Sequence, residues 1–183
     1  MALLADRAVG GLLFDRDDTL VVDVPYNADP HQVVPLPGAR RAVDRARAAG
    51  LPVGVVTNQS VIARGGATRS QVDATNARVD DLVGPFDVWC VCPHGPDDDC
   101  ACRKPRPGLV LEAAARLGVP AEHLVVIGDI GADVGAARAA GAQAILVPTP
   151  RTRPEEVAAA DTVADTIEAA VALALDHVPA ASA

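Results

Sequence analysis

Five short apolar runs, separated by alanine-rich stretches, restrict most strongly what this chain can fold into. Each run is rich in Val, Ile or Leu and is bounded by Gly, Pro or Asp. Continuous apolar runs of this length are typical of strands buried on both faces of a parallel sheet. The runs are GLLF (11–14), LPVGVVT (51–57), DVWCVC (87–92), HLVVIGD (123–129) and AQAILVP (142–148).

The stretches between these runs have the composition of helices. They lie at roughly 38–49, 68–83, 107–117 and 132–140, with a last one near 163–176. Strands that alternate with helices predict an α/β fold, in which helices flank a doubly wound, Rossmann-like parallel sheet. We expect the 183 residues to form one domain, 1–183, because a second full domain has no room.

The charge of the chain limits its partners. A formal net charge of -8 disfavours nucleic acid and anionic membrane surfaces, so a polyanionic substrate would need a local cationic site. Asp6 and Arg7 interrupt the first apolar residues, and no apolar run approaches the roughly twenty residues of a membrane span. We therefore expect a cytoplasmic monomer that acts on a small molecule.

Acidic residues follow the first and fourth apolar runs. Asp15 and Asp17 come after GLLF, and Asp129 and Asp133 come after HLVVIG. Ligands of open parallel sheets bind at the carboxyl ends of the strands, so these side chains are expected to share one crevice. Two charges about 4 Å apart repel by roughly 4 kcal/mol at an effective dielectric near 20. Mg²⁺ relieves such repulsion and accepts a phosphate oxygen. Taken singly, each pair also fits a turn or a helix cap.

Two further segments offer groups that hold a phosphate. Thr57 supplies a hydroxyl at the end of the second run, and Asn58 supplies amide donors. In CRKPRPG, Lys104 is suited to cancel phosphate charge, and Arg103 is suited to bind a second anionic group. Ordinary turn residues and solvated surface cations are the alternatives for these segments.

All four cysteines lie between positions 90 and 102, where a local metal site fits better than a disulfide framework. Cys92, His94, Cys100 and Cys102 have the residue types of a structural zinc site within a loop at about 90–103. Ordering some ten residues of this loop costs on the order of 10–20 kcal/mol, which a zinc ion supplying roughly 10–16 kcal/mol offsets. An all-cysteine site that includes Cys90 is the alternative.

The order of these motifs resembles the haloacid dehalogenase superfamily of phosphohydrolases over almost the whole chain. The segments FDRDDTL, VVTNQSVIARG, CPHGPDDDCACRKPRPG and GDIGAD are similar to those of D-glycero-D-manno-heptose 1,7-bisphosphate phosphatases and of histidinol-phosphate phosphatases. Many members of this superfamily cover the active site with an inserted cap domain, but no segment of this chain is long enough to form one, so we expect a capless fold. The resemblance implies two catalytic carboxylates and a magnesium ion. It also favours His94 over Cys90 as a zinc ligand.

The resemblance implies a role for each site residue. Asp15 is the nucleophile that forms an aspartyl phosphate, and Asp17 is the general acid and base. Thr57 and Lys104 hold the phosphoryl oxygens. The implied Mg²⁺ ligands are Asp15, Asp129 and the Asp17 carbonyl, with Asp133 in support. Candidate substrate contacts are Asp23, Tyr26, Asn58, Gln59, Ser60 and Arg103.

Three positions depart from the heptose pattern. Ile130 replaces the usual lysine after GD, Val21 replaces a common asparagine, and Asp18 stands at a turn position where glycine is usual. Removal of the 7-phosphate of the heptose bisphosphate is the first prediction, and histidinol phosphate or another sugar or alcohol phosphate is the alternative. A receiver-like phospho-signalling domain and a zinc-dependent binding module are the non-enzyme alternatives.

Overall fold

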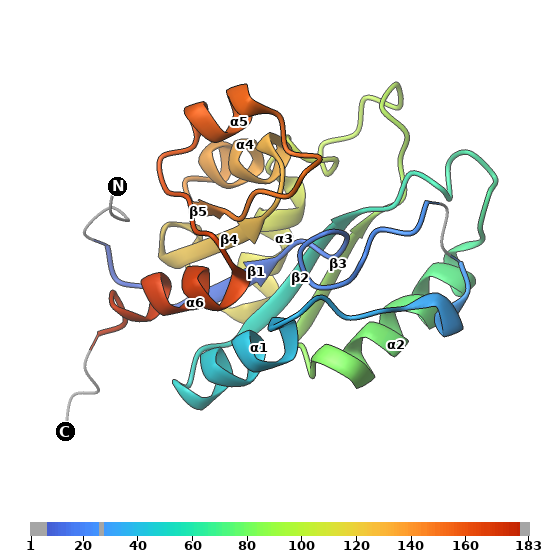
Figure 1. The fold of residues 1–183 in the computed structure, drawn as a ribbon. Helices are drawn as coiled ribbons and strands as arrows, with labels where there is room; N and C mark the ends of the chain where they lie inside the picture. The colour runs from blue at the N-terminus through green and yellow to red at the C-terminus, as the bar shows by residue number, and fades with distance from the viewer. Residues whose placement is uncertain (1–6, 26–27, 180–183) are drawn as a thin grey trace.

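A five-stranded parallel sheet forms the centre of the computed structural model, which describes residues 7–25 and 28–179 (Figure 1). All five apolar runs are strands, so the predicted parallel sheet is confirmed. The strands are β1 (Gly11–Phe14), β2 (Val53–Asn58), β3 (Val88–Cys92), β4 (Leu124–Gly128) and β5 (Gln143–Leu146).

The strand order is β3-β2-β1-β4-β5, which places β1 at the centre. The chain first builds the sheet from β1 towards β3 and then returns to place β4 on the other side of β1. The carboxyl ends of β1 and β4 therefore meet at a topological switch point, where sheets of this kind bind their ligands. The register pairs Phe14 with both Val55 and Ile127, so Asp15, the residue after β1, aligns with Gly128 at the end of β4, directly before Asp129.

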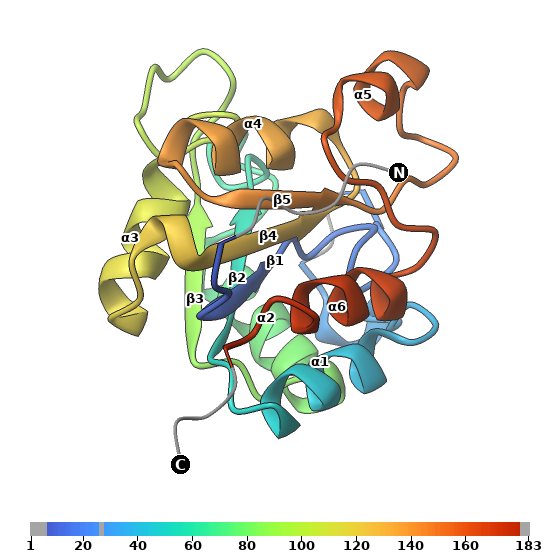
Figure 2. The same ribbon diagram turned by 90° about the vertical axis from the view of Figure 1, so that its left-hand side faces the viewer.

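Helices cover both faces of the sheet, as Figure 2 shows. On one face lie α1 (Ala39–Ala48), α2 (Arg69–Val83) and α6 (Ile167–Leu175), and on the other lie α3 (Gly108–Leu117) and α4 (Gly131–Ala140). Short 3₁₀ turns occupy Pro30–Gln32 (η1) and Ala121–His123 (η2). Leu12 and Phe14 pack on the α1 side and Leu13 packs on the α3 side, because side chains alternate along a strand.

Two helix predictions need correction. The last helix begins at Ile167, not near 163, because the Thr166 side chain caps it by accepting a hydrogen bond from the Ala169 amide. The preceding residues instead extend the sheet edge, where the Leu146 amide donates to the Thr162 carbonyl and the Ala164 amide donates to the Leu146 carbonyl, each at 2.9 Å. A further helix, α5 (Pro154–Ala159), packs against α4 and was not expected, because its six residues bury no apolar face.

The segment between β1 and α1 contains only η1 among its described residues, so no cap-sized element covers the sheet edge there. Within the described ranges, no helix combines the length and the apolar character needed to cross a bilayer.

Candidate active site

Three buried carboxyl groups meet at the switch point. Asp15 directly follows β1, Asp129 directly follows β4, and Asp133 lies in the first turn of α4. One oxygen of each lies within 4.8 Å of one oxygen of the other two. The parallel register of β1 and β4 accounts for this, because it ends both strands at the same edge.

Lys104 is the cation that faces this cluster. Its Nζ lies 2.8 Å from Asp15 Oδ1 and 2.6 Å from Asp133 Oδ1, and it donates a 2.8 Å hydrogen bond to the Val56 carbonyl. The ammonium group is buried, which alone would lower its pKa, but the charges of Asp133 and Asp15 outweigh this and raise the Lys104 pKa. Lys104 is thus held as a permanent positive charge beneath the site.

One cation does not balance the cluster. Burial, partly offset by Lys104, raises the pKa of Asp15 to about 7, and burial together with Asp15 raises the pKa of Asp129 to about 8. A second cation beside these carboxyl groups would therefore stabilise the ionised form of both. The donors are carboxylate oxygens, which are the ligands that Mg²⁺ prefers, so the residues fit a magnesium ion.

The Asp17 side chain is held apart from these three carboxyl groups. Arg16 binds it with Nε and Nη2, each at 3.0 Å, and Gln59 Nε2 donates to it at 2.8 Å. Arg16 is itself anchored on α2 by Asn76, at 2.7 Å. Sequence reasoning assigned no role to Arg16, although an arginine between two predicted active-site aspartates is a signal for such a pairing.

The turn after β1 starts at Asp18, which has a φ of 53°. This left-handed conformation explains why glycine suits the position, and it confirms that Asp18 is a turn residue. The backbone amides of Leu20 and Val21 close the turn on the Arg16 carbonyl. As a result, Thr19 Oγ1 lies 3.5 Å from Asp129 Oδ1.

A cavity of about 330 Å³ opens above the carboxyl groups. It is lined by Asp15, Asp17, Asp18, Asp23, Thr57, Asn58, Arg103, Lys104, Asp129, Ile130 and Arg151. An adjoining cavity of about 310 Å³ shares Asp17, Asp23 and Asn58 with it and adds Gln59 and Ser60. The structure thus brings the predicted residues together, except that Tyr26 lies outside the described residues.

Two residues that were predicted to contact the substrate, Asn58 and Gln59, form hydrogen bonds with other residues of the protein. The Asn58 side chain accepts from the Lys104 backbone N–H and donates to the Lys104 carbonyl, both at 3.1 Å. Gln59 Nε2 also donates to Thr57 Oγ1, at 3.0 Å. Asn58 therefore fixes the Lys104 backbone, and Gln59 connects Thr57 with Asp17. These contacts depend on the tertiary fold and leave no signal in the local sequence.

Arg151 lies on the loop between β5 and α5, and sequence reasoning did not identify it. Its guanidinium lies at the cavity, 2.5 Å from Asp23 and 3.4 Å from Asp18. Thr152, the next residue, donates a 2.6 Å hydrogen bond to the Asp129 carbonyl. The sequence signal is weak, because Arg151 and Arg153 look alike in a segment rich in Thr and Pro.

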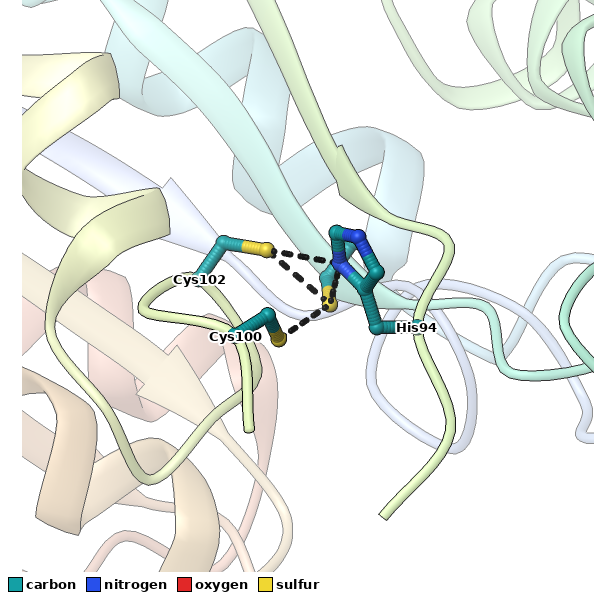
Figure 3. A group of neighbouring side chains, drawn as sticks. His94, Cys100 and Cys102 are labelled. Carbon is teal, nitrogen blue, oxygen red and sulfur yellow. Dashed lines mark hydrogen bonds between the residues drawn. The ribbon is translucent and has the colours of Figure 1, made fainter. Parts of the chain in front are cut away.

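The predicted zinc ligands also come together. Figure 3 shows His94, Cys100 and Cys102 turned toward one another at the loop after β3. Neighbouring ligand atoms of these residues and Cys92 are 3.2–3.7 Å apart. Tetrahedral zinc with its usual bond lengths separates such atoms by about 3.6–3.8 Å, so the four residues fit Zn²⁺.

Cys90 is not part of this group. It is fully buried among apolar residues of β3 and α3, and burial raises the pKa of its thiol to about 12. It therefore remains a protonated core residue. The predicted zinc ligand Cys102 immediately precedes Arg103 and Lys104, which both line the cavity.

Comparisons with known proteins give a consistent result. The model of the HAD-hydrolase-like family matches residues 101–170. The chain is 38% identical over 143 residues to the D-glycero-beta-D-manno-heptose-1,7-bisphosphate 7-phosphatase of Pseudomonas aeruginosa, covering 75% of this chain and 80% of that protein. The enzyme of the same name from Mesorhizobium japonicum is 41% identical over 148 residues, with 74% and 68% covered.

A solved structure gives the same match. The crystal structure of the D,D-heptose 1,7-bisphosphate phosphatase from Bordetella bronchiseptica, complexed with magnesium and phosphate, superposes with a TM-score of 0.79. The identity is 31%, and the match covers 91% of this chain and 98% of that one.

The zinc loop predicts a metal-dependent stability. We expect one zinc ion per chain by elemental analysis, and we expect Cys100→Ser to lose both the zinc and several degrees of Tm, because the loop has few apolar contacts of its own. Cys90→Ala is the matched control, since it removes a buried sulfur outside the ligand group and should keep the zinc. A Cys100→Ser protein that retained a full equivalent of zinc would contradict this assignment.

The raised pKa values in the carboxyl cluster predict that the Tm of the magnesium-free protein depends on pH. A carboxyl group with a raised pKa in the folded chain binds its proton more tightly there, so its contribution to stability is lost as the pH rises through that pKa. With the pKa of Asp15 about 7 and that of Asp129 about 8, against about 4 for an unfolded Asp, the Tm of magnesium-free protein should fall between about pH 4 and about pH 8. Added Mg²⁺ should reduce the fall.

Calorimetry after dialysis against magnesium-free buffer measures the Tm at each pH. Chelators are omitted from the buffer so that the zinc site stays intact. Asp129→Asn should show a smaller fall than wild type because it cannot ionise. A Tm that rose steadily over this pH range in the magnesium-free protein would refute the expectation.

Proposed function

Since this chain belongs to the haloacid dehalogenase-like phosphatase family, it is a phosphoric monoester hydrolase, and we propose that it removes the 7-phosphate of D-glycero-D-manno-heptose 1,7-bisphosphate. The observation that carries the proposal is the gathering of Asp15, Asp129 and Lys104 at the floor of an open cavity. The names of the relatives supply the substrate.

In the proposed reaction, Asp15 is the nucleophile. A carboxylate oxygen of Asp15 forms a bond to phosphorus, and the bond from phosphorus to the sugar oxygen breaks. Asp17 gives a proton to the departing oxygen. A water molecule then attacks the aspartyl phosphate and gives its proton to Asp17, which releases inorganic phosphate and restores both carboxyl groups.

The contacts support this division of roles. Lys104 and the Arg16 amide both bind Asp15 Oδ1, at 2.8 and 2.7 Å, which fixes the orientation of the carboxylate. Asp17 is held separately by Arg16 and Gln59, towards the side where the two cavities join. The nucleophile and the acid thus occupy different electrostatic surroundings, as their different tasks require.

Asp15 and Asp129, with the Asp17 carbonyl and with Asp133 in support, would hold Mg²⁺. When bound, the ion supplies positive charge to the transferred phosphoryl group and to its nucleophile. Thr57 and Lys104 bind the phosphoryl oxygens as charge develops on them. Asp133 also accepts from the Ile130 amide at 3.2 Å and so fixes the start of α4 behind the metal ligands.

We further propose that residues 1–183 form one phosphohydrolase domain, which acts in the cytoplasm as a monomer without nucleic-acid or membrane partners. The formal charge of -8 supports the lack of anionic partners.

One observation favours a second candidate substrate. Ile130 lines the cavity with an uncharged side chain where the heptose enzymes usually carry lysine. A substrate with one phosphate, such as histidinol phosphate or another small sugar or alcohol phosphate, would not require a cation there.

Replacing the two catalytic aspartates tests the mechanism. We expect Asp15→Asn to abolish turnover, because an amide does not attack phosphorus, and Asp17→Asn to lower kcat by about 10²–10⁴-fold. Both variants should keep the wild-type far-UV circular dichroism and zinc content. Steady-state hydrolysis comparable to wild type in folded Asp15→Asn would exclude the proposed nucleophile.

A panel of phosphate esters tests the substrate. With Mg²⁺ present, kcat/KM should be highest for a heptose 1,7-bisphosphate among both of its anomers, histidinol phosphate and common sugar monophosphates. Phosphate release at several substrate concentrations gives these values. Equal values across the panel, or a clear preference for histidinol phosphate, would reject the heptose assignment.

A further inference from the structure

The cavity is lined by two guanidinium groups, Arg103 and Arg151, to which the catalytic scheme gives no task. A heptose bisphosphate carries one phosphate that is transferred and one that is retained. Lys104, Thr57 and the metal ligands serve the first. At the position where related sequences supply a lysine, this chain has Ile130, which cannot bind the second.

Arg151 lines the same cavity as Ile130. The loop that carries Arg151 is attached to the residues before Ile130, because Val147 donates to the Gly128 carbonyl at 2.8 Å and Thr152 donates to the Asp129 carbonyl at 2.6 Å. The position of Arg151 relative to the metal ligands is therefore set by the fold.

The loop is also braced internally. Thr152 Oγ1 accepts from the Thr149 amide at 2.8 Å, and Thr149 Oγ1 accepts from the Arg151 amide at 3.2 Å. At its end, Glu156 accepts from the Arg153 amide at 3.0 Å and starts α5. The backbone at Arg151 is thus fixed, while its side chain remains 58% exposed.

The Arg151 guanidinium uses only one of its three nitrogen atoms in the ion pairs that the structure describes. Its ion pairs with Asp23 and Asp18 both use Nη1, and the structure assigns Nε and Nη2 no partner among the described residues. A guanidinium presents donors in a planar fork that matches two oxygens of one phosphate. Arg151 can therefore bind an anion at its free edge while Nη1 keeps its carboxylate partner.

Arg103 is the other guanidinium that lines the cavity, and its Nη1 donates to the His94 carbonyl at 3.2 Å. Arg103 belongs to the zinc loop that follows β3, and Arg151 belongs to the loop that follows β5. These strands are the two edges of the sheet, and Asp15 lies between them at the end of the central β1. Five carboxyl groups and three cationic side chains line the cavity. Because the carboxylates repel an anionic substrate, each contact with a cationic side chain improves its binding free energy.

We propose that Arg151 is a specificity-determining residue, which binds the retained phosphate of a bisphosphate substrate in place of the cation that is absent at position 130. This inference rests on the proposed function. It assigns the preference for a second phosphate to a loop after β5 instead of to the residue after Asp129.

Kinetics on a matched substrate pair test the proposal. With heptose 1,7-bisphosphate, Arg151→Ala should raise KM by about 10- to 100-fold, the effect of losing hydrogen bonds to a charged group, while kcat changes little. With heptose 7-phosphate, which lacks the second phosphate, both constants should change less than about threefold. Arg151→Lys should keep part of the preference, because it keeps the charge without the fork.

Two further variants separate binding from a structural effect. Arg153→Ala is the matched control, since Arg153 lies two residues away, pairs with Glu156 and is absent from the lining of the catalytic cavity. It should leave both substrates unaffected. Ile130→Lys, added to Arg151→Ala, should lower KM for the bisphosphate again without altering that for the monophosphate. Equal losses for both substrates in Arg151→Ala, or no rescue by Ile130→Lys, would overturn the inference.

The wild-type enzyme distinguishes this failure from failure of the proposed function. If wild type hydrolyses the bisphosphate and the monophosphate equally well, or neither of them, the proposed substrate is wrong and the role of Arg151 falls with it. If wild type prefers the bisphosphate and Arg151→Ala keeps that preference, only the role of Arg151 is wrong.

Discussion

The contact of Lys104 with Asp15 and Asp133 is the interaction on which the rest of the site depends. It joins three separate parts of the chain, namely the end of β1, the first turn of α4 and the segment after the zinc loop. A buried lysine is stable only where carboxylates and carbonyls surround it, as they do here. Asn58 holds the Lys104 backbone through two hydrogen bonds, and Lys104 follows the predicted zinc ligand Cys102 by two residues, so the predicted metal loop and the candidate active site are directly connected.

The excess negative charge of Asp15, Asp129 and Asp133 over Lys104 explains why a phosphatase of this family would need magnesium at this site. Lys104 meets Asp15 and Asp133 but has no contact with Asp129, which burial leaves with a raised pKa. Asp15 and Asp129 would hold a divalent cation, which would supply the positive charge that the cluster still lacks. In the proposed function, the buried charge of Lys104 serves the chemistry, and the guanidinium groups of Arg103 and Arg151, which line the same cavity, serve recognition.

The sequence predicts the parts of this structure that follow from periodicity and chain order. The five strands are continuous apolar runs, and the catalytic candidates stand at their carboxyl ends, so topology alone brings Asp15 and Asp129 together. Contacts between distant segments were not predictable. Neither the anchoring of Arg16 by Asn76 nor the capture of the Lys104 backbone by Asn58 has a local signal. The helix α5 lacks an apolar face, and Arg151 gains its position only from the hydrogen bonds of its loop.

In the proposed mechanism Asp15 and Asp129 share one divalent cation, and a crystal soaked in Mn²⁺ shows whether they do. Anomalous scattering at the manganese absorption edge locates the ion independently of any assumed ligand. We expect one anomalous peak within bonding distance of carboxylate oxygens of both residues, and loss of that peak in Asp129→Ala. A peak bound elsewhere, or to only one of the two residues at saturating Mn²⁺, would contradict this mechanism.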